Sequence, residues 1–180
     1  MTETGHDMTV GDTGDTDLLG GALVHKWDLR PETYSTIDEA TSALGLARAL
    51  ATEPAVREAI HDVQQDLHQL MAELATPVED EARLGFRVTD EHIAKIERRL
   101  EEAKGRVAIG NQFIIPGATV PGAALDLART IVRRAERDAA RLAHEGGVAN
   151  PAILRYLNRL SDLVFVLARL EEHGGSEPVG

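Results

Sequence analysis

Cysteine is absent from the 180-residue sequence, which excludes disulfide bonds, thiolate zinc sites and cysteine nucleophiles. This absence is compatible with a reducing cytoplasm, where we expect the protein to reside. No run of about 18 apolar residues occurs, so the sequence predicts no membrane-spanning helix. The polar, acidic N-terminal stretch contains no apolar segment, and we therefore expect no signal peptide.

Aromatic residues are also scarce, at 3% of the chain. Alanine, leucine, arginine and glutamate are abundant instead, and this composition favours helices. Basic residues are too few for general nucleic-acid binding, because 19 of them stand against 30 acidic residues and the net charge is -11. We therefore expect no nucleic-acid partner, and an anionic ligand would require a local concentration of arginine.

Hydrophobic periodicity predicts five helices joined by mostly short links, and hence an all-α five-helix bundle. The expected ranges are 36–51, 54–75, 89–104 and 121–144, with a fifth helix that starts at Pro151. The first helix is expected to open on a capping box formed by Thr36 and Glu39. The fifth is expected to have Asn150 as its cap, with the proline in the first turn.

The remaining segments are expected to be irregular, because Gly, Pro, Asp and Thr interrupt any sustained period there. These segments cover residues 8–35, 76–88 and 105–120. We expect residues 1–7 to be disordered, residues 8–172 to form one domain and residues 173–180 to form a flexible tail. The chain length fits such a single domain.

The required arginine cluster occurs in the fourth predicted helix. Arg129, Arg133 and Arg137 recur every four residues and share one helix face, with Arg134 beside them. One interpretation is a solvated basic face that is paired with nearby acids. The other is a polyphosphate clamp, because arginine forks match phosphate oxygens in two-point geometry.

Two further patterns are weak by themselves. The Gly- and Thr-rich loop over residues 11–16 resembles a phosphate cradle, although it lacks the Gly-Lys-Ser/Thr ending of a P-loop. Glu58 and His61 form half of a di-iron carboxylate motif, but no second Glu-x-x-His copy lies on a suitable helix. The sequence therefore predicts no metal ligand from the protein.

Several blocks in order resemble the PduO-type ATP:cob(I)alamin adenosyltransferases. They are VGDTGDTDLLGG (10–21), TIDE (36–39), QQDLHQLMAELATP (64–77), FIIPG (113–117), ARTIVRRAER (128–137) and YLNRLSDLVFVLAR (156–169). The resemblance runs from about residue 8 to residue 170, and the blocks RRAER and YLNRLSD are specific for this family.

The resemblance implies a homotrimer of helical bundles with active sites between adjacent subunits. The implied reaction transfers the 5′-deoxyadenosyl group of ATP to cob(I)alamin and yields adenosylcobalamin and triphosphate. The implied ligands are ATP, Mg²⁺ bound with the ATP, and cobalamin. The implied partners are an adenosylcobalamin-dependent mutase and a reductase.

The same resemblance implies roles for individual residues. Phe113 would press on the lower face of cobalamin and keep a fifth ligand off the cobalt, and Asp162 would also contact cobalamin. Asp38 would pair with Arg129 across the subunit boundary. The implied catalytic set consists of Phe113, Arg133, Asp38 and Arg129. The implied ATP-binding residues are Thr9, Val10, Gly11, Asp12, Gly14, Asp15, Thr16, Lys26, Arg133, Arg134, Glu136, Arg137 and Asn158.

The chain departs from the family pattern mainly in the nucleotide loop. Thr9 stands where the family has Lys or Arg, Asp15 and Asp17 replace Thr and Gly, and Asp126 replaces His in the fourth helix. These changes leave a second function open, namely a non-catalytic carrier or sensor of adenosylcobalamin. Some of the implied site residues also have a purely structural interpretation. Phe113 could fill a gap in the core, and Asp38 and Arg129 could form an ordinary surface ion pair. Asn158 could cap a buried carbonyl.

Overall fold

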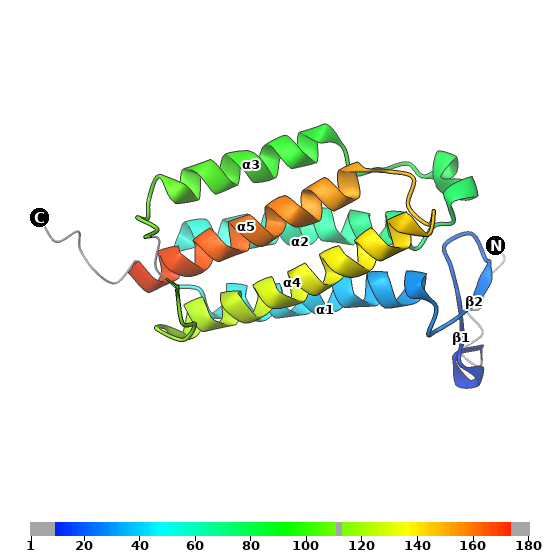
Figure 1. Cartoon of the computed structure of the whole chain (residues 1–180), viewed down its shortest axis with the longest axis horizontal. Helices are drawn as coiled ribbons and strands as arrows, with labels where there is room; N and C mark the ends of the chain where they lie inside the picture. The colour runs from blue at the N-terminus through cyan, green and yellow to red at the C-terminus, as the bar shows by residue number, and fades with distance from the viewer. Residues whose placement is uncertain (1–9, 111–112, 174–180) are drawn as a thin grey trace, which may run out of the picture.

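The computed structural model describes residues 10–110 and 113–173, which form an elongated bundle of five α-helices (Figure 1). The helices are α1 (Leu29–Leu50), α2 (Pro54–Leu74), α3 (Asp90–Lys104), α4 (Val120–His144) and α5 (Ala152–His173). This confirms the prediction of an all-α five-helix fold. Within the described ranges, no helix is long and apolar enough to cross a membrane.

The core is built from buried apolar side chains of all five helices. Helix α4 packs along both α1 and α5, while α2 covers the other side of α1 and α3 covers α5. Helix α5 is buried on several sides, as its apolar pattern predicts, and each fully buried aliphatic side chain contributes about 1.5–3 kcal/mol relative to exposure. The largest core side chains include Ile37, Leu44, Ile60, Leu67, Leu125, Leu157, Leu160 and Leu163.

The predicted start of the first helix is wrong, because α1 begins at Leu29 and continues through Thr36. The Thr36 hydroxyl does not cap the helix. It donates to the Glu32 carbonyl one turn back, 2.9 Å away, and also lies 3.1 Å from Asp138 Oδ2 on α4. A threonine that bonds to the i−4 carbonyl satisfies its hydroxyl inside a helix. Pro31 is tolerated because it lies in the first turn, where its missing N–H has no partner to lose.

The predicted starts of the other four helices are confirmed to within one residue. Thr89 immediately precedes α3, and its backbone N–H donates to His92 Nδ1 over 3.1 Å. Asn150 Oδ1 accepts from the backbone N–H of Ala152 over 3.0 Å at the start of α5. Asn150 also donates from Nδ2 to Glu73 Oε1 over 2.7 Å, so the same residue joins the end of α2 to the start of α5.

The segments expected to be irregular contain some regular structure. A 3₁₀ turn (η1, Val10–Thr13) is followed by strands β1 (Asp15–Asp17) and β2 (Leu23–His25), which pair antiparallel with Thr16 opposite Val24. A second 3₁₀ segment, η2 (Val78–Arg83), follows α2. The hairpin lies beyond the end of the bundle where α1 begins (Figure 1). The predicted disorder of residues 1–7 falls outside the described residues, as does the predicted tail except for His173.

Arg30 ties this end of the bundle together. Its guanidinium donates to the carbonyls of Leu74 (2.7 Å), Thr76 (3.0 Å) and Gly147 (2.8 Å). Leu74 ends α2, Thr76 follows it, and Gly147 lies between α4 and α5. Burial lowers the pKa of Arg30. The backbone N–H of Leu19 donates to the Ala75 carbonyl over 2.9 Å, so the same turn also anchors the hairpin.

Candidate functional site

The glycine-rich loop folds back onto the segment that follows the hairpin. Lys26 Nζ donates to the Gly11 carbonyl over 2.6 Å, and the Lys26 backbone N–H donates to the Gly14 carbonyl over 2.9 Å. Gly14 has a φ of 90°, and a Cβ placed on it would lie 3.1 Å from the Trp27 ring. The positive φ therefore favours glycine at this position, and a Cβ would also crowd the Trp27 ring.

Asp15, where the family has Thr, is paired within the hairpin. Its Oδ1 lies 2.7 Å from His25 Nδ1, and its Oδ2 accepts from the Thr13 hydroxyl over 3.1 Å. The hydrogen bond to His25, followed by that to Thr13, lowers the pKa of Asp15. The His25 ring stacks on Trp27 with centroids 4.5 Å apart. The Asp15 carboxylate thus has two side-chain partners close to it in the chain.

The remaining predicted loop residues are Thr9, Val10, Asp12 and Thr16. Thr9 lies outside the described residues, and of Val10 only the backbone position in η1 is described. Asp12 is exposed. Thr16 forms a side-chain hydrogen bond with Tyr34 that acts to lower the pKa of this phenol, but burial dominates and raises it.

The arginines of α4 fall into two groups. Arg134 forms an ion pair with Glu39 of α1, and Arg137 donates to the Arg133 carbonyl over 3.0 Å. The Arg133 side chain is exposed and has no hydrogen bond or ion pair among the residues that the structure describes. The solvated, paired face predicted as one alternative therefore fits Arg134 but leaves Arg133 free for a ligand.

Glu136 and Asn158 join α4 to α5 beside these arginines. Asn158 Nδ2 donates to Glu136 Oε1 over 2.9 Å, and Arg159 NH1 lies 3.4 Å from Asn158 Oδ1. Within the described ranges Asn158 is held by two side chains and does not bond to a backbone carbonyl. Its interpretation as a cap on a buried carbonyl is therefore wrong.

Asp38 and Arg129 do not meet within one chain. Arg129 Nε donates to Asp126 Oδ1 over 3.1 Å, and the guanidinium carbon lies 5.8 Å from the centre of the Phe165 ring. Asp38 is exposed on α1 and has no side-chain partner in residues 10–110 and 113–173. The predicted pair thus requires a second copy of the chain, as the prediction of a pair across a subunit boundary states.

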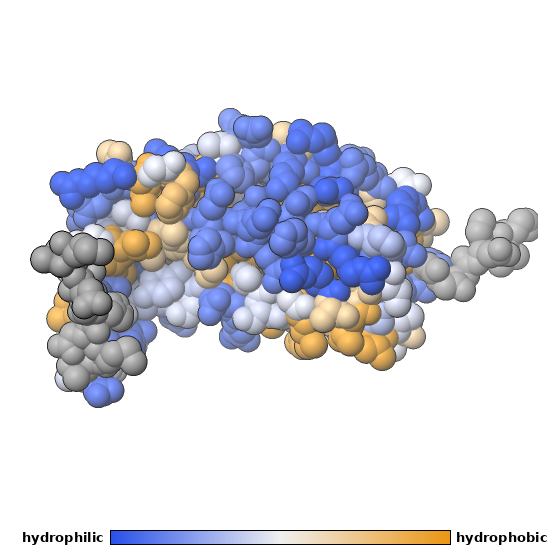
Figure 2. Space-filling model, turned by 180° about the vertical axis from the view of Figure 1, so that it is seen from behind, coloured by the Kyte–Doolittle hydropathy of each residue, from blue (hydrophilic) through white to orange (hydrophobic). Residues whose placement is uncertain are grey.

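Phe113 is 95% exposed, so its alternative interpretation as a core plug is wrong. Its neighbour Ile115 is 81% exposed, and Val120 at the start of α4 is 67% exposed. Figure 2 shows hydrophobic surface at this end of the bundle, away from the hairpin. Asp162 on α5 is also exposed and forms no side-chain hydrogen bond or ion pair with another described residue. A large apolar side chain on the surface is available to contact a ligand or another chain.

The predicted site residues lie in three separate places along the bundle. The hairpin precedes α1 at one end, Arg133 lies near the middle of α4, and Phe113 precedes α4 at the other end (Figure 1). The 25 residues of α4 correspond to about 37 Å of helix. One chain therefore groups the loop residues with Lys26, and the arginines with Glu136 and Asn158, but it does not join these groups to Phe113.

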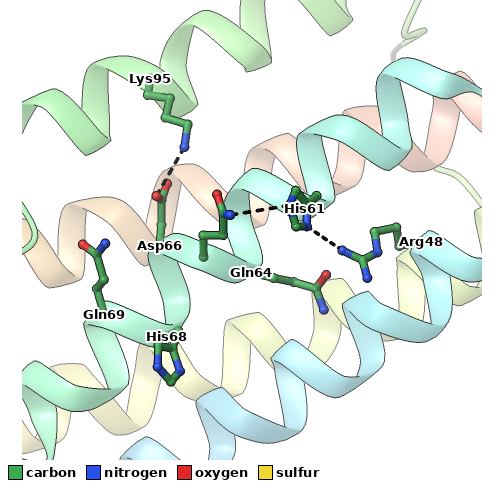
Figure 3. A pocket seen from close by; sticks show the side chains of 8 residues that line it. Arg48, His61, Gln64, Asp66, His68, Gln69 and Lys95 are labelled. Carbon is green, nitrogen blue, oxygen red and sulfur yellow. Dashed lines mark hydrogen bonds and ion pairs between the residues drawn. The ribbon is translucent and has the colours of Figure 1, made fainter.

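A polar cavity of about 780 Å³ lies on another part of the bundle, between α1, α2 and α3. It contains none of the predicted site residues. Figure 3 shows that His61, from the half di-iron motif, points toward Arg48. The distance between Arg48 Nη1 and His61 Nδ1 is 2.7 Å. No group of three His, Cys, Asp or Glu residues that could hold a metal ion occurs among the described residues. The half motif therefore does not form a metal site within them.

Residue spacing alone did not reveal two side-chain contacts of the structure, one within the hairpin and one between α4 and α5. His25 lies opposite Asp15 because of the register of the hairpin. The adjacent glycines Gly20 and Gly21 are a sequence signal for the turn that sets this register. Arg169 of α5 binds Asp126 of α4, and the two residues are 43 positions apart. No local pattern relates residues at that separation.

A family model described as cobalamin adenosyltransferase matches residues 7–171. The chain is 39% identical over 163 residues to the corrinoid adenosyltransferase PduO of Citrobacter freundii, which covers 91% of this chain but 48% of that relative. It is 37% identical to a second Citrobacter freundii corrinoid adenosyltransferase, covering 90% and 92% of the two chains. A Mycobacterium leprae corrinoid adenosyltransferase is also 37% identical, with 91% and 89% covered. The chain thus spans about half of the first relative and nearly all of the other two.

Solved structures give the same similarity. A variant PduO-type ATP:corrinoid adenosyltransferase from Lactobacillus reuteri, complexed with cobalamin and ATP, superimposes with a TM-score of 0.85. The two chains are 31% identical, and 95% of each is covered. Another variant of this Lactobacillus reuteri protein, complexed with ATP, has a TM-score of 0.84 and 30% identity over 95% of this chain. The fold described above is therefore the fold of these proteins.

Proposed function

This chain belongs to the cobalamin adenosyltransferase family, and we propose that it transfers the 5′-deoxyadenosyl group of ATP to cob(I)alamin. The proposal is supported by 37% identity to a corrinoid adenosyltransferase over 90% of this chain. The observation that carries it is Arg133 in the middle of α4, which is exposed and has no partner among the described residues. A guanidinium that has no internal acid is available to a phosphate group.

ATP would be bound by the hairpin loop and the α4 arginines together. In the loop, Gly11 and Gly14 keep the backbone close to any bound anion, and Lys26 lies beside them. On α4, Arg133 would contact the triphosphate and stabilise its negative charge as it departs. The described residues offer no cluster of metal ligands, so Mg²⁺ would be held mainly by the phosphates of ATP.

Cobalamin would be bound against the exposed Phe113. The aromatic ring would occupy the lower face of the corrin and keep a fifth ligand from the cobalt. In the reaction, the cobalt(I) electron pair forms a bond to the ribose 5′ carbon while the bond from that carbon to the triphosphate oxygen breaks. This step consumes no proton, so the protein supplies orientation and charge stabilisation and needs no general base.

We also propose that the chain acts as a homotrimer with shared sites. Phe113 and the hairpin lie at opposite ends of a bundle whose α4 spans about 37 Å. ATP and cobalamin must come into contact to react. Each active site would therefore combine residues of one chain with residues of another. Asp38, which is exposed and has no partner in the described part of the chain, fits the proposed pair with Arg129 of a neighbouring copy. We further propose that the protein is located in the cytoplasm. Its proposed partners there are a reductase and an adenosylcobalamin-dependent mutase.

The test is an anaerobic assay in which chemically reduced cobalamin and MgATP are mixed with the protein. The absorbance spectrum should change to that of adenosylcobalamin, and triphosphate should form in equal amount. Binding of adenosylcobalamin without product formation would instead support the carrier or sensor function. Product formation without triphosphate release would contradict the proposed displacement at the 5′ carbon.

A further inference from the structure

Asp126 of α4 is a buried acid shared by two arginines. Its side chain is 3% exposed, and its two oxygens face different partners. Oδ1 accepts from Arg129 Nε over 3.1 Å, and Oδ2 accepts from Arg169 NH2. Arg169 comes from α5 and is equally buried, so this carboxylate links the two helices through charged hydrogen bonds.

The two guanidinium groups are also held by an aromatic ring and a second acid. The Phe165 ring lies 5.8 Å from the Arg129 guanidinium carbon and 5.1 Å from that of Arg169, within the range of cation–π attraction. Glu172 Oε1 accepts from Arg169 NH2 over 3.0 Å. Two cations and two acids therefore balance each other, which is the condition under which buried charges are tolerated.

This arrangement leaves the two terminal nitrogens of Arg129 without a partner in the described part of the chain. Only Nε is bonded to Asp126, whereas the side chain as a whole is 25% exposed. An arginine anchored at Nε and by ring contact has lost most of its rotational freedom already. Its terminal fork can then bind an external carboxylate in two-point geometry with little further loss of entropy.

We propose that Asp126 and Arg169 are positioning residues that hold Arg129 in the orientation needed to bind Asp38 of a second copy. The inference rests on the proposed function, because that pair is part of the proposed shared site. Arg169 fixes Asp126, Asp126 fixes Nε of Arg129, and Phe165 supports both guanidinium groups. The family resemblance has His at position 126, and one imidazole cannot accept from two guanidinium groups as a carboxylate does.

The first experiment measures hydrogen exchange of the arginine Nε–H groups by NMR in protein labelled with ¹⁵N-arginine. Arg98 on α3 provides the reference, because it is exposed and its side chain has no partner among the residues that the structure describes. The variants Arg129→Lys and Arg98→Lys assign the two signals by their disappearance. We expect the Arg129 signal to exchange about tenfold more slowly than the Arg98 signal. In Asp126→Asn the two signals should exchange at similar rates.

The second experiment is a double-mutant cycle on turnover. Asp126→Asn should lower kcat about tenfold while the KM for ATP stays unchanged, because Arg129 no longer presents its fork in one orientation. In an Arg129→Ala background, the same Asp126→Asn change should have no further effect. A purely structural role for Asp126 predicts an equal loss in both backgrounds. The Asp126→His variant should behave like Asp126→Asn.

The exchange measurement on the unsubstituted protein needs no variant at position 126, so a folding failure of Asp126→Asn leaves the test intact. Equal exchange of the Arg129 and Arg98 signals in that protein would overturn the inference. An additive loss in the cycle would overturn it as well. If the unsubstituted protein makes no adenosylcobalamin, the proposed function fails, while the exchange rates still decide whether Asp126 orients Arg129.

Discussion

His25 Nδ1 lies 2.7 Å from Asp15 Oδ1, and the two residues face each other across the hairpin register. Asp15 is one of the two acids that replace uncharged family residues in the glycine-rich loop. A free carboxylate there would repel a triphosphate. Because His25 and Thr13 both bond to it, the Asp15 carboxylate is held by side chains of the hairpin and of the turn before it.

His25→Ala should weaken ATP binding, since it leaves Asp15 unpaired near the phosphates. We expect the dissociation constant to rise by about two- to fivefold, the range for an exposed ion pair. Calorimetric titration of the protein with MgATP measures this change. The double variant His25→Ala with Asp15→Thr should bind at least as well as the unsubstituted protein. Weak binding by the double variant would show that His25 acts in another way.

The same contact predicts the titration of Asp15. Hydrogen bonds from His25 and Thr13 lower the pKa of Asp15 below 3.8. A lowered pKa means that the pair stabilises the folded hairpin above pH 3.8, and that this contribution is lost as the pH falls through the lowered value. Carboxyl ¹³C titration by NMR should give a midpoint below 3.8. In His25→Ala the midpoint should move up toward 3.8, and an unchanged midpoint would argue against the pair in solution.

Arg133→Ala should reduce kcat/KM for adenosyl transfer by at least about 100-fold, the loss typical of removing one charge-stabilising donor from a transition state. The melting temperature should change little, because Arg133 has no side-chain partner among the described residues. Anaerobic turnover and thermal unfolding measure the two effects. Arg98→Ala, at another exposed arginine, is the matched control and should keep full activity. Full activity in Arg133→Ala would reject the phosphate contact.

Phe113→Ala should leave the fold intact, since a side chain that is 95% exposed contributes little to the core. It should abolish most adenosyl transfer, because the lower face of the corrin would no longer be covered. The absorbance of bound cob(II)alamin reports whether the cobalt keeps a fifth ligand. We expect the four-coordinate spectrum with the unsubstituted protein and MgATP, and the five-coordinate spectrum with Phe113→Ala. Phe86→Ala serves as a control at a partly exposed aromatic residue.

Asn150→Ala should destabilise the fold without altering the chemistry. The change removes the cap on Ala152 and the hydrogen bonds to Glu73 (2.7 Å) and the Val88 carbonyl (2.8 Å). We expect the free energy of unfolding to fall by about 2–3 kcal/mol. Urea unfolding measures it, and turnover per folded molecule should be unchanged. A loss below about 0.5 kcal/mol would show that these bonds are replaced by water.

Local patterns were sufficient for most of the fold. The apolar stripes of α2 and α4 repeat every three to four residues, and such a period is visible in a short stretch of sequence. The start of α5 was also readable, because the Asn150 cap acts only two residues away. The start of α1 was predicted wrongly, since Thr36 and Glu39 match a capping box at the level of sequence. The hydroxyl of Thr36 found a carbonyl of the preceding turn instead.

The sequence by itself determined the number of helices, the family and the arginine face of α4, because these depend on residue order and on spacings of three or four. Only the tertiary structure decided which arginines are free. Arg134 is neutralised by Glu39, which is 95 residues away, while its neighbour Arg133 has no partner within residues 10–110 and 113–173. The physical reason is that an ion pair between helices depends on their relative rotation and register. These are set by the packing of the whole core, and no short stretch of sequence contains them.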